Sequence, residues 1–180
     1  MPQRKKQTQK TLARSLKRIK LLILDVDGVL TDGKLVYNSD GIELKSFDVK
    51  DGYGLVRLKQ SGVRLGIITA KMSSIVETRA RDLGIDRLYQ NVADKLDAYE
   101  DIKKTYNLSD TEIAYIGDDV PDLVVLRQAG VPIAVHDAVD PVRAAAVYIT
   151  KHCGGNGAVR EVADMILQAK GLLPDAKRHG

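Results

Sequence analysis

Short apolar runs recur along the chain, and the segments between them carry apolar residues at helical spacing. The first run, Leu21 to Leu24, contains no polar position. Unbroken apolar runs of this length are typical of parallel strands that are buried on both faces. Further segments rich in β-branched and apolar residues follow, so we predict strands at 21–24, 63–68, 87–90, 113–116, 132–135 and 147–150.

Helices are predicted between these strands. Ser74, with Glu77 three residues later, resembles a capping box that opens one of them, and Gly84 closes the same helix, while Gly62 closes the helix before it. Regular alternation of strand and helix predicts a parallel sheet that helices cover on both sides, a Rossmann-like α/β fold. The predicted helices lie at 51–62, 74–84, 95–106, 141–146 and 158–170, and a further one, after the strand at 113–116, ends at Ala129.

A β-hairpin is predicted directly after the first strand. Residues 34–37 and 42–49 carry β-type side chains, and Asn38 to Gly41 between them have the composition of a turn. The hairpin is too small to close over a site by itself. No G-x-G-x-x-G motif follows the first strand, so a dinucleotide-binding fold has no support.

The charge is distributed unevenly. The first 20 residues contain 8 of the 28 basic residues and no acid, which leaves 20 bases against 24 acids in the remaining 160. We predict a flexible basic leader at 1–18, one domain at 19–171 and a tail at 172–180. Leu12, Leu16 and Ile19 fall near helical spacing, so the second half of the leader is expected to form a short helix on the domain. Attachment of the leader to nucleic acid or to an anionic surface is the less favoured interpretation.

The sequence favours a cytoplasmic location. No apolar run is long enough to span a membrane, and the polar N-terminus does not resemble a secretory signal. The single cysteine, Cys153, cannot form an internal disulfide, which agrees with a reducing compartment. The three histidines show no ligand spacing, and we assign none of them to a metal.

Polar residues follow the predicted strands. Taken alone, each has an ordinary explanation, such as a solvated turn or a helix start. Carboxyl ends of parallel strands meet at one edge of a sheet, so these side chains are expected to lie together. Clustered carboxylates bind Mg²⁺, whereas a hydroxyl and an ammonium hold phosphate oxygens, a combination suited to phosphoryl transfer. The residues are Asp25, Asp27, Thr69, Lys95, Asp118, Asp119 and Asp122.

This set resembles the four motifs of the haloacid dehalogenase superfamily of phosphohydrolases, in its minimal-cap subclass. Within it, LLILDVDGVLTDGKL, FDVKDGYG, AYIGDD and GGNGAVREVAD are similar to segments of the 3-deoxy-D-manno-octulosonate 8-phosphate phosphatases. The resemblance spans residues 19–171. It implies a Mg²⁺-dependent enzyme of lipopolysaccharide precursor synthesis that releases the free sugar acid and phosphate.

The resemblance also implies roles for single residues. Asp25 would attack phosphorus and become an aspartyl phosphate, while Asp27 would protonate the leaving sugar oxygen and later activate water. The metal would be held by Asp25, the backbone carbonyl of Asp27 and Asp118. Thr69 and Lys95 would bind the phosphoryl group. The metal shell or its loop would be supported by Asp119 and Asp122.

Substrate contacts are implied by the same resemblance, at a second set of residues. The family usually has Thr-Gly-Arg where this chain has Thr69-Ala70-Lys71, and often an arginine in place of Val56. Lysine keeps the charge but loses the bidentate geometry of arginine. Besides Asp27 and Lys95, the expected substrate-binding residues are Asp48, Val49, Lys50, Asp51, Gly52, Lys71 and Arg79.

The small hairpin leaves the site without a cap domain, and the resemblance implies a homotetramer in which hairpins pack together. Gly154 to Gly157 and Arg160 would then lie at an interface. Other substrates remain open, including a nonulosonate 9-phosphate or a nucleic-acid end. A non-enzymatic phospho-acceptor domain is a further alternative, but its aspartates usually occur in a different strand order.

Overall fold

A fully parallel sheet forms the centre of the molecule. The computed structural model describes residues 9–173. The strand order is β5-β4-β1-β6-β7-β8, and every residue of β1 is buried, as its unbroken apolar run predicts. The strands are β1 Leu21–Leu24, β4 Arg64–Ile68, β5 Arg87–Tyr89, β6 Ile113–Gly117, β7 Val131–Ala134 and β8 Tyr148–Ile149.

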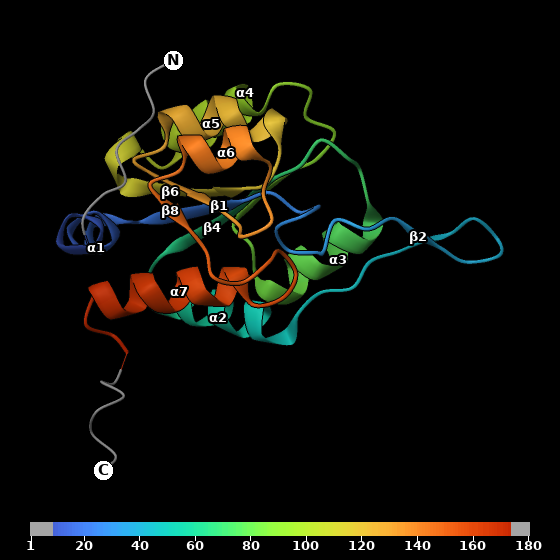
Figure 1. Ribbon diagram of the computed structural model, residues 1–180, viewed down its shortest axis with the longest axis horizontal. Helices are drawn as coiled ribbons and strands as arrows, with labels where there is room; N and C mark the ends of the chain where they lie inside the picture. Colours follow the sequence, from blue (N-terminus) through green and yellow to red (C-terminus); the bar gives the residue numbers. More distant parts are fainter. Residues whose placement is uncertain (1–8, 174–180) are drawn as a thin grey trace, which may run out of the picture.

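Helices cover both faces of this sheet (Figure 1). One layer holds α2, α3 and α7, and the opposite layer holds α4, α5 and α6, so the predicted α/β architecture is confirmed. Within residues 9–173, none of the helices has the length and apolar character needed to cross a membrane. The helices are α1 Gln9–Arg18, α2 Val49–Gln60, α3 Ser74–Leu83, α4 Lys95–Thr105, α5 Leu123–Gln128, α6 Asp140–Ala145 and α7 Ala158–Ala169, with short 3-10 turns η1 Asp110–Glu112 and η2 Val120–Asp122.

The direction of the winding reverses at the central strand. From β1 the chain proceeds outward through β4 and β5, and it then returns to place β6 on the other side of β1. Leu24 is consequently paired with Ile67 on one side and with Ile116 on the other. The carboxyl ends of β1 and β6 are neighbours at this switch point, where open α/β sheets bind their ligands.

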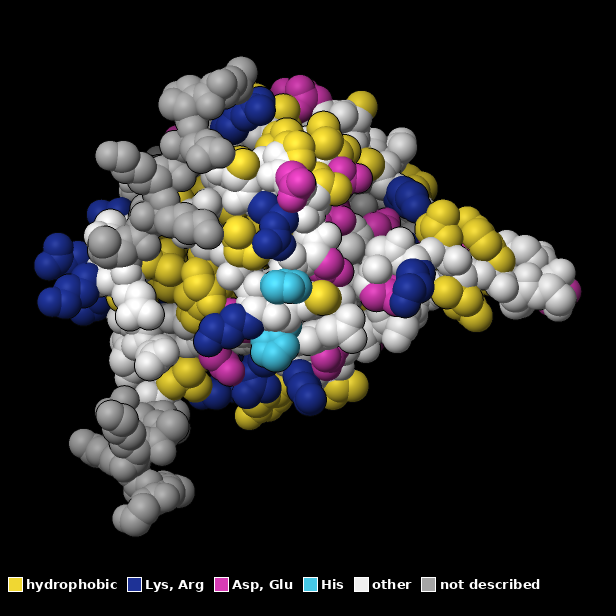
Figure 2. All heavy atoms as spheres, viewed as in Figure 1, with side chains coloured by type: hydrophobic (Ala, Val, Ile, Leu, Met, Phe, Trp, Pro, Cys, Tyr) yellow, Lys and Arg dark blue, Asp and Glu magenta, His cyan; other side chains and the backbone are white. Residues whose placement is uncertain are grey.

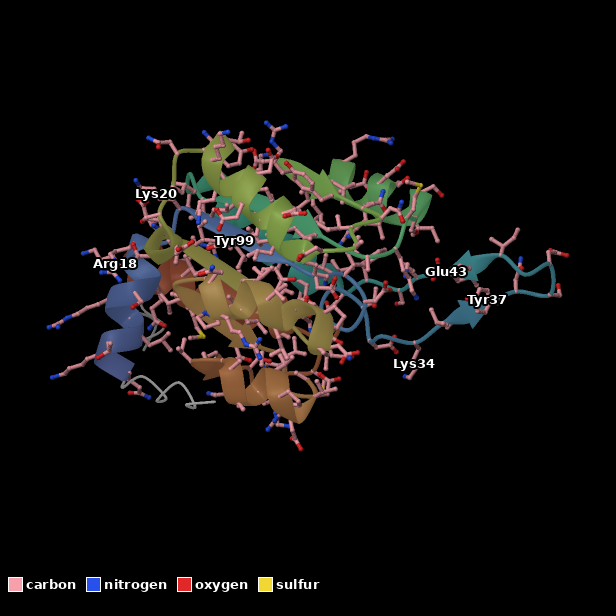
Figure 3. The ribbon with its side chains drawn as sticks, turned by 90° about the horizontal axis from the view of Figure 1, so that it is seen from above. Arg18, Lys20, Lys34, Tyr37, Glu43 and Tyr99 are labelled. Carbon is pink, nitrogen blue, oxygen red and sulfur yellow. The ribbon has the colours of Figure 1, made fainter. Side chains whose placement is uncertain are left out.

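The hairpin after β1 projects from the body of the molecule (Figure 3). Its strands, β2 Val36–Tyr37 and β3 Glu43–Leu44, pair antiparallel and are much shorter than predicted. The predicted turn is confirmed, since the side-chain oxygen of Asn38 accepts hydrogen bonds from two backbone N–H groups across it. Val49 lies in α2 rather than in the hairpin, because Asp48 caps that helix and so begins it earlier than expected.

Helix α1 packs against the domain. Leu12 and Leu16 are buried on it, and Ile19 is buried just beyond its end, so the predicted helix in the leader is confirmed. Of the leader predicted to be flexible at 1–18, residues 9–18 form this packed helix, and residues 1–8 lie outside the described part of the chain. The same holds for most of the predicted tail, from residue 174 onward.

The capping box predicted at Ser74 is wrong by one residue. Ser73 is the N-cap of α3, and its side chain makes no capping hydrogen bond. Glu77 instead accepts a hydrogen bond from the Gln90 amide at 3.0 Å, while the Gln90 oxygen accepts from the Ser73 backbone at 2.8 Å. Gln90, just beyond β5, therefore makes the hydrogen bonds to Ser73 and Glu77 that the local pattern assigned to a capping box.

Candidate active site

The polar residues predicted at the strand ends lie around one cavity. Asp25 follows β1, Thr69 follows β4, and Asp118 follows β6, while Lys95 is the first residue of α4. The cavity has a volume of about 290 Å³ and lies at the switch point of the sheet. Its lining is completed by Asp27, Gly33, Ala70, Lys71, Asp119, Pro121 and Asp122.

Lys95 connects two buried carboxylates. Its ammonium donates to Asp25 Oδ1 at 2.8 Å and to Asp122 Oδ1 at 2.6 Å, and the exposed fractions of these three side chains are 5%, 10% and 1%. Burial and the nearby Asp122 raise the pKa of Asp25 to about 6, against the lowering effect of Lys95. Burial would lower the pKa of Lys95, but the two carboxylates outweigh it and raise that pKa. Lys95 therefore remains a cation beside Asp25.

Asp122 has no free oxygen for a ligand. Oδ1 accepts from Lys95 and from the Tyr115 hydroxyl at 2.6 Å, and Oδ2 accepts from the backbone N–H groups of Asp118 at 2.9 Å and Asp119 at 3.3 Å. These bonds fix the loop after β6 and the position of the Lys95 ammonium. The supporting role that the resemblance implies for Asp122 stays a prediction.

Asp118 lies in a cluster of carboxyl groups whose negative charge is not fully balanced. Burial and the charges of Asp25, Asp122 and Asp119 raise the pKa of Asp118 to about 8, because one ammonium cannot balance four neighbouring carboxyl groups. Carboxylate oxygens of Asp25, Asp118 and Asp122 lie within 4.8 Å of one another. The donor set consists of hard oxygen ligands, which suits Mg²⁺. With Asp122 already saturated, Asp25 and Asp118 are the side chains available to hold it.

Two glycine contacts fix the loop that follows β1. Gly28 has a φ of +91°, and a Cβ there would lie 2.0 Å from Asp118 Oδ2, so only glycine lets the loop approach that carboxylate. A Cβ on Gly154 would lie 1.7 Å from the carbonyl oxygen of Gly28. The Gly155 N–H also donates to the Val29 carbonyl at 2.9 Å. Within the chain, the glycine-rich segment expected at an interface therefore packs against the catalytic loop.

The predicted substrate-binding residues do not all reach the cavity. Lys71 lines it beside Thr69, whose hydroxyl accepts from the Lys71 N–H at 3.4 Å. Asp48 instead caps α2, and Asp51 is buried, where it accepts from the backbone N–H groups of Gly157 and Arg160 at the start of α7.

Four further residues of the expected set also lie outside the lining of this cavity. The Val49 side chain is strongly exposed, and Lys50 borders a separate hollow beside α7. The guanidinium of Arg79 packs against Gly52 and over the ring of Phe47 at 5.6 Å. The substrate roles of these residues stay predictions.

Lys45 was not predicted from the sequence. It follows β3 at the base of the hairpin, and its ammonium contacts Asp27 Oδ1 and, at 3.2 Å, Glu43. Burial would lower the pKa of Lys45, but the hydrogen bonds and charges of the two carboxylates outweigh it and raise that pKa. In the sequence, a lysine in a polar hairpin resembles a solvated residue, so no local pattern could have indicated this contact.

Comparison with known proteins identifies the family. A profile for haloacid dehalogenase-like hydrolases matches residues 67–162. The chain belongs to this family. Within it, the chain is 44% identical over 159 residues to the 3-deoxy-D-manno-octulosonate 8-phosphate phosphatase KdsC of Escherichia coli K12, covering 88% of this chain and 85% of that protein. The Yersinia pestis enzyme of the same name is 46% identical over 158 residues, covering 88% and 84%.

Solved structures of family members superpose on the whole domain. The octulosonate phosphatase of Moraxella catarrhalis, crystallised with magnesium, phosphate and the sugar acid KDO, has a TM-score of 0.89 at 46% identity and covers 91% of this chain and 94% of that one. The cobalt-bound enzyme of Haemophilus influenzae has a TM-score of 0.84 at 40% identity, covering 87% and 92%. The resemblance drawn from the motifs is thus confirmed, and the phospho-acceptor alternative loses its support.

Proposed function

We propose that this haloacid dehalogenase-like hydrolase is a Mg²⁺-dependent phosphatase that converts 3-deoxy-D-manno-octulosonate 8-phosphate to the free sugar acid and phosphate. The observation that carries the proposal is the buried Asp25–Lys95–Asp122 cluster, which opens with Asp118 and Thr69 into one cavity. Relatives that carry this activity in their names are 44% and 46% identical to this chain over 159 and 158 aligned residues. The reaction belongs to the synthesis of lipopolysaccharide precursors.

Asp25 is the proposed nucleophile. Its carboxylate would form a bond to phosphorus while the bond from phosphorus to the sugar oxygen breaks, which leaves an aspartyl phosphate. Lys95 holds the same carboxylate at 2.8 Å, so the attacking group is fixed in direction before substrate binds. A bound Mg²⁺ would offset the negative charge of the phosphoryl group and of the surrounding carboxylates.

Asp27 is the proposed proton carrier. It would give a proton to the departing sugar oxygen, and as a carboxylate it would then take one from the water that hydrolyses the aspartyl phosphate. Thr69 and Lys71, which lie together on the cavity wall, would hold the phosphoryl oxygens and the sugar-acid carboxylate. Lys71 supplies a point charge where relatives are expected to have an arginine.

Phosphate release tests the assignment. With Mg²⁺ present, the wild-type chain should prefer the eight-carbon acid phosphate over nonulosonate 9-phosphates, hexose phosphates and a 3′-phosphorylated oligonucleotide. Asp25→Asn should lose at least about 10³-fold in kcat with an unchanged circular dichroism spectrum, because an amide is a poor nucleophile. Undiminished release by this variant would refute the mechanism, and a flat substrate profile would refute the assigned substrate.

A nonulosonate 9-phosphate is the second candidate substrate. Ala70 and Lys71 line the cavity. The resemblance implies glycine and arginine at these two positions in the octulosonate phosphatases, a difference that would change the shape and hydrogen bonding of the pocket. The double change Ala70→Gly with Lys71→Arg should improve kcat/KM for the eight-carbon acid. If the wild-type chain instead has a higher kcat/KM for the nine-carbon acid phosphate than for the eight-carbon one, the second candidate is favoured.

The proposed assembly is a homotetramer packed through the hairpins. Leu35, Val36, Tyr37, Ile42 and Leu44 are all about half exposed, and Figure 2 shows apolar side chains gathered where the hairpin leaves the body. Exposed apolar patches on small projecting elements commonly mark interfaces. Light scattering should report a tetramer that Tyr37→Lys disrupts. A monomeric wild-type chain would refute this assembly.

The cytoplasmic location stays a prediction from the sequence.

A further inference from the structure

Lys45 holds a position that a surface lysine does not usually take. Its side chain is only 2% exposed, although it belongs to a hairpin whose apolar side chains are largely open to solvent. The ammonium is enclosed between the carboxylates of Asp27 and Glu43. Burying a lysine is unfavourable unless its charge is paired, so these two carboxylates determine where the side chain lies.

The contact approaches Asp27 from outside the reaction cavity. Asp27 lines the cavity together with Lys71 and Lys95, whereas Lys45 is not part of that lining. Lys45 occupies Oδ1 of Asp27, and among the described residues no hydrogen bond is made to Oδ2. One oxygen of the proton carrier is therefore held by the protein, and the other remains available to the substrate.

We propose that Lys45 is a positioning residue that orients Asp27 for proton transfer to the leaving oxygen, an inference that rests on the proposed phosphatase function. Asp27 lies on the loop after β1, and its side chain is 24% exposed, so packing alone does not fix its rotamer. The ammonium supplies the missing constraint. Glu43 contacts Lys45 from the same hairpin and keeps the ammonium directed at Asp27. The hairpin thereby contributes to catalysis through a side chain that never touches substrate.

The chemistry of the leaving group provides a direct test. A sugar alkoxide needs a proton as the bond to phosphorus breaks, whereas 4-nitrophenolate leaves readily without one. The rapid first release of each leaving group isolates formation of the aspartyl phosphate from its hydrolysis. Wild type, Lys45→Met and Lys45→Arg would be compared by rapid quench with the sugar-acid phosphate and by stopped flow with 4-nitrophenyl phosphate.

Lys45→Met should slow release of the sugar acid by about 10–100-fold, a part of what a general acid contributes, and slow nitrophenolate release by less than about threefold. KM for the sugar-acid phosphate should stay within about twofold. Lys45→Arg should recover part of the loss, since it restores a cation with a different geometry. Lys34→Met is the matched control, because Lys34 pairs with Asp32 at 2.9 Å in the same segment but is 76% exposed, and both of its release rates should equal those of wild type.

Three results would overturn the proposal. Equal slowing of both leaving groups would mean that Lys45 only stabilises the hairpin, and a raised KM with unchanged release rates would make it a substrate ligand. Unchanged kinetics would leave it without a role in the reaction. Failure of the wild-type chain to hydrolyse the sugar-acid phosphate would instead refute the proposed function, so the two failures are distinguishable.

Discussion

Removing the Lys95 ammonium tests how the site balances its charge. Lys95→Met keeps the length of the side chain and opens no large cavity, but it leaves Asp25 and Asp122 buried without their shared cation. Breaking a buried ion pair by removing one partner usually costs about 3–5 kcal/mol. The two hydrogen bonds lost, each to a charged acceptor and worth roughly 1.5–3 kcal/mol, give a similar sum.

The cost should depend on pH. The pKa of Asp25 is already raised to about 6 from 3.8, so the folded state holds this proton more tightly than the unfolded state, and ionisation opposes folding as the pH rises through this window. Without the ammonium, the pKa of Asp25 rises further because its lowering partner is gone, so Asp25 can stay protonated in mild acid. We therefore expect a smaller loss of stability at about pH 5 than at about pH 7.5.

Urea unfolding followed by circular dichroism, with EDTA present, measures this difference. Lys103→Met is the matched control, since Lys103 lies on the same helix and also contacts two carboxylates, Glu100 at 2.7 Å and Asp110 at 3.1 Å, both substantially exposed. The control should lose about 1 kcal/mol or less, because solvent screens such pairs. The charge argument is wrong if Lys95→Met loses no more unfolding free energy than the control at about pH 7.5. It is also wrong if the loss for Lys95→Met at about pH 5 equals its loss at about pH 7.5.

Three further predictions address metal binding, the glycine contacts and the leader. Mg²⁺ should raise the thermal unfolding midpoint more at about pH 8 than at about pH 5.5, because Asp118, whose pKa is about 8, must lose its proton to bind metal. A fluorimetric melt measures the midpoint, and equal shifts at the two pH values would argue against Asp118 as a ligand. Gly154→Ala should abolish phosphate release, since its Cβ would overlap Gly28, whereas Gly41→Ala, with no atom within 4 Å, should cost only about 1 kcal/mol and keep activity. Leu16→Ala should cost about 2–4 kcal/mol in urea unfolding, and a cost near zero would show that α1 does not stabilise the domain.

The sheet and its polar edge could be predicted because their signals are local. The run from Leu21 to Leu24 has one reasonable interpretation, and the aspartates after it follow directly in sequence. The rule that carboxyl ends of parallel strands meet then brings Thr69, Lys95 and Asp118 to the same place. Helix limits were less predictable, as at Ser74, because a partner distant in sequence, Gln90, competes for the expected capping groups.

Lys45 could not be predicted because its role depends on how the hairpin lies against the domain. The contact joins residues 18 positions apart, and neither the alternation of the hairpin nor its turn residues specify it. Asp51 shows the same limit. It is bonded to the start of α7, a contact across 109 residues to Arg160 that no local pattern specifies, and its substrate role stays a prediction.

The glycine-rich segment before α7 packs against the loop after β1, on the side opposite to Asp118. On one side, Gly28 lies against the Asp118 carboxylate at the end of β6, and on the other its carbonyl lies against Gly154. The loop that carries Asp25 and Asp27 is therefore held between two close contacts, at Gly28 and at Gly154, that leave no room for a side chain at either glycine. Small displacements of reacting groups lower rates steeply, so a site without a cap domain gains from such a rigid loop. Lys45 then supplies from the hairpin a constraint that these glycine contacts cannot give, which is the orientation of the Asp27 side chain.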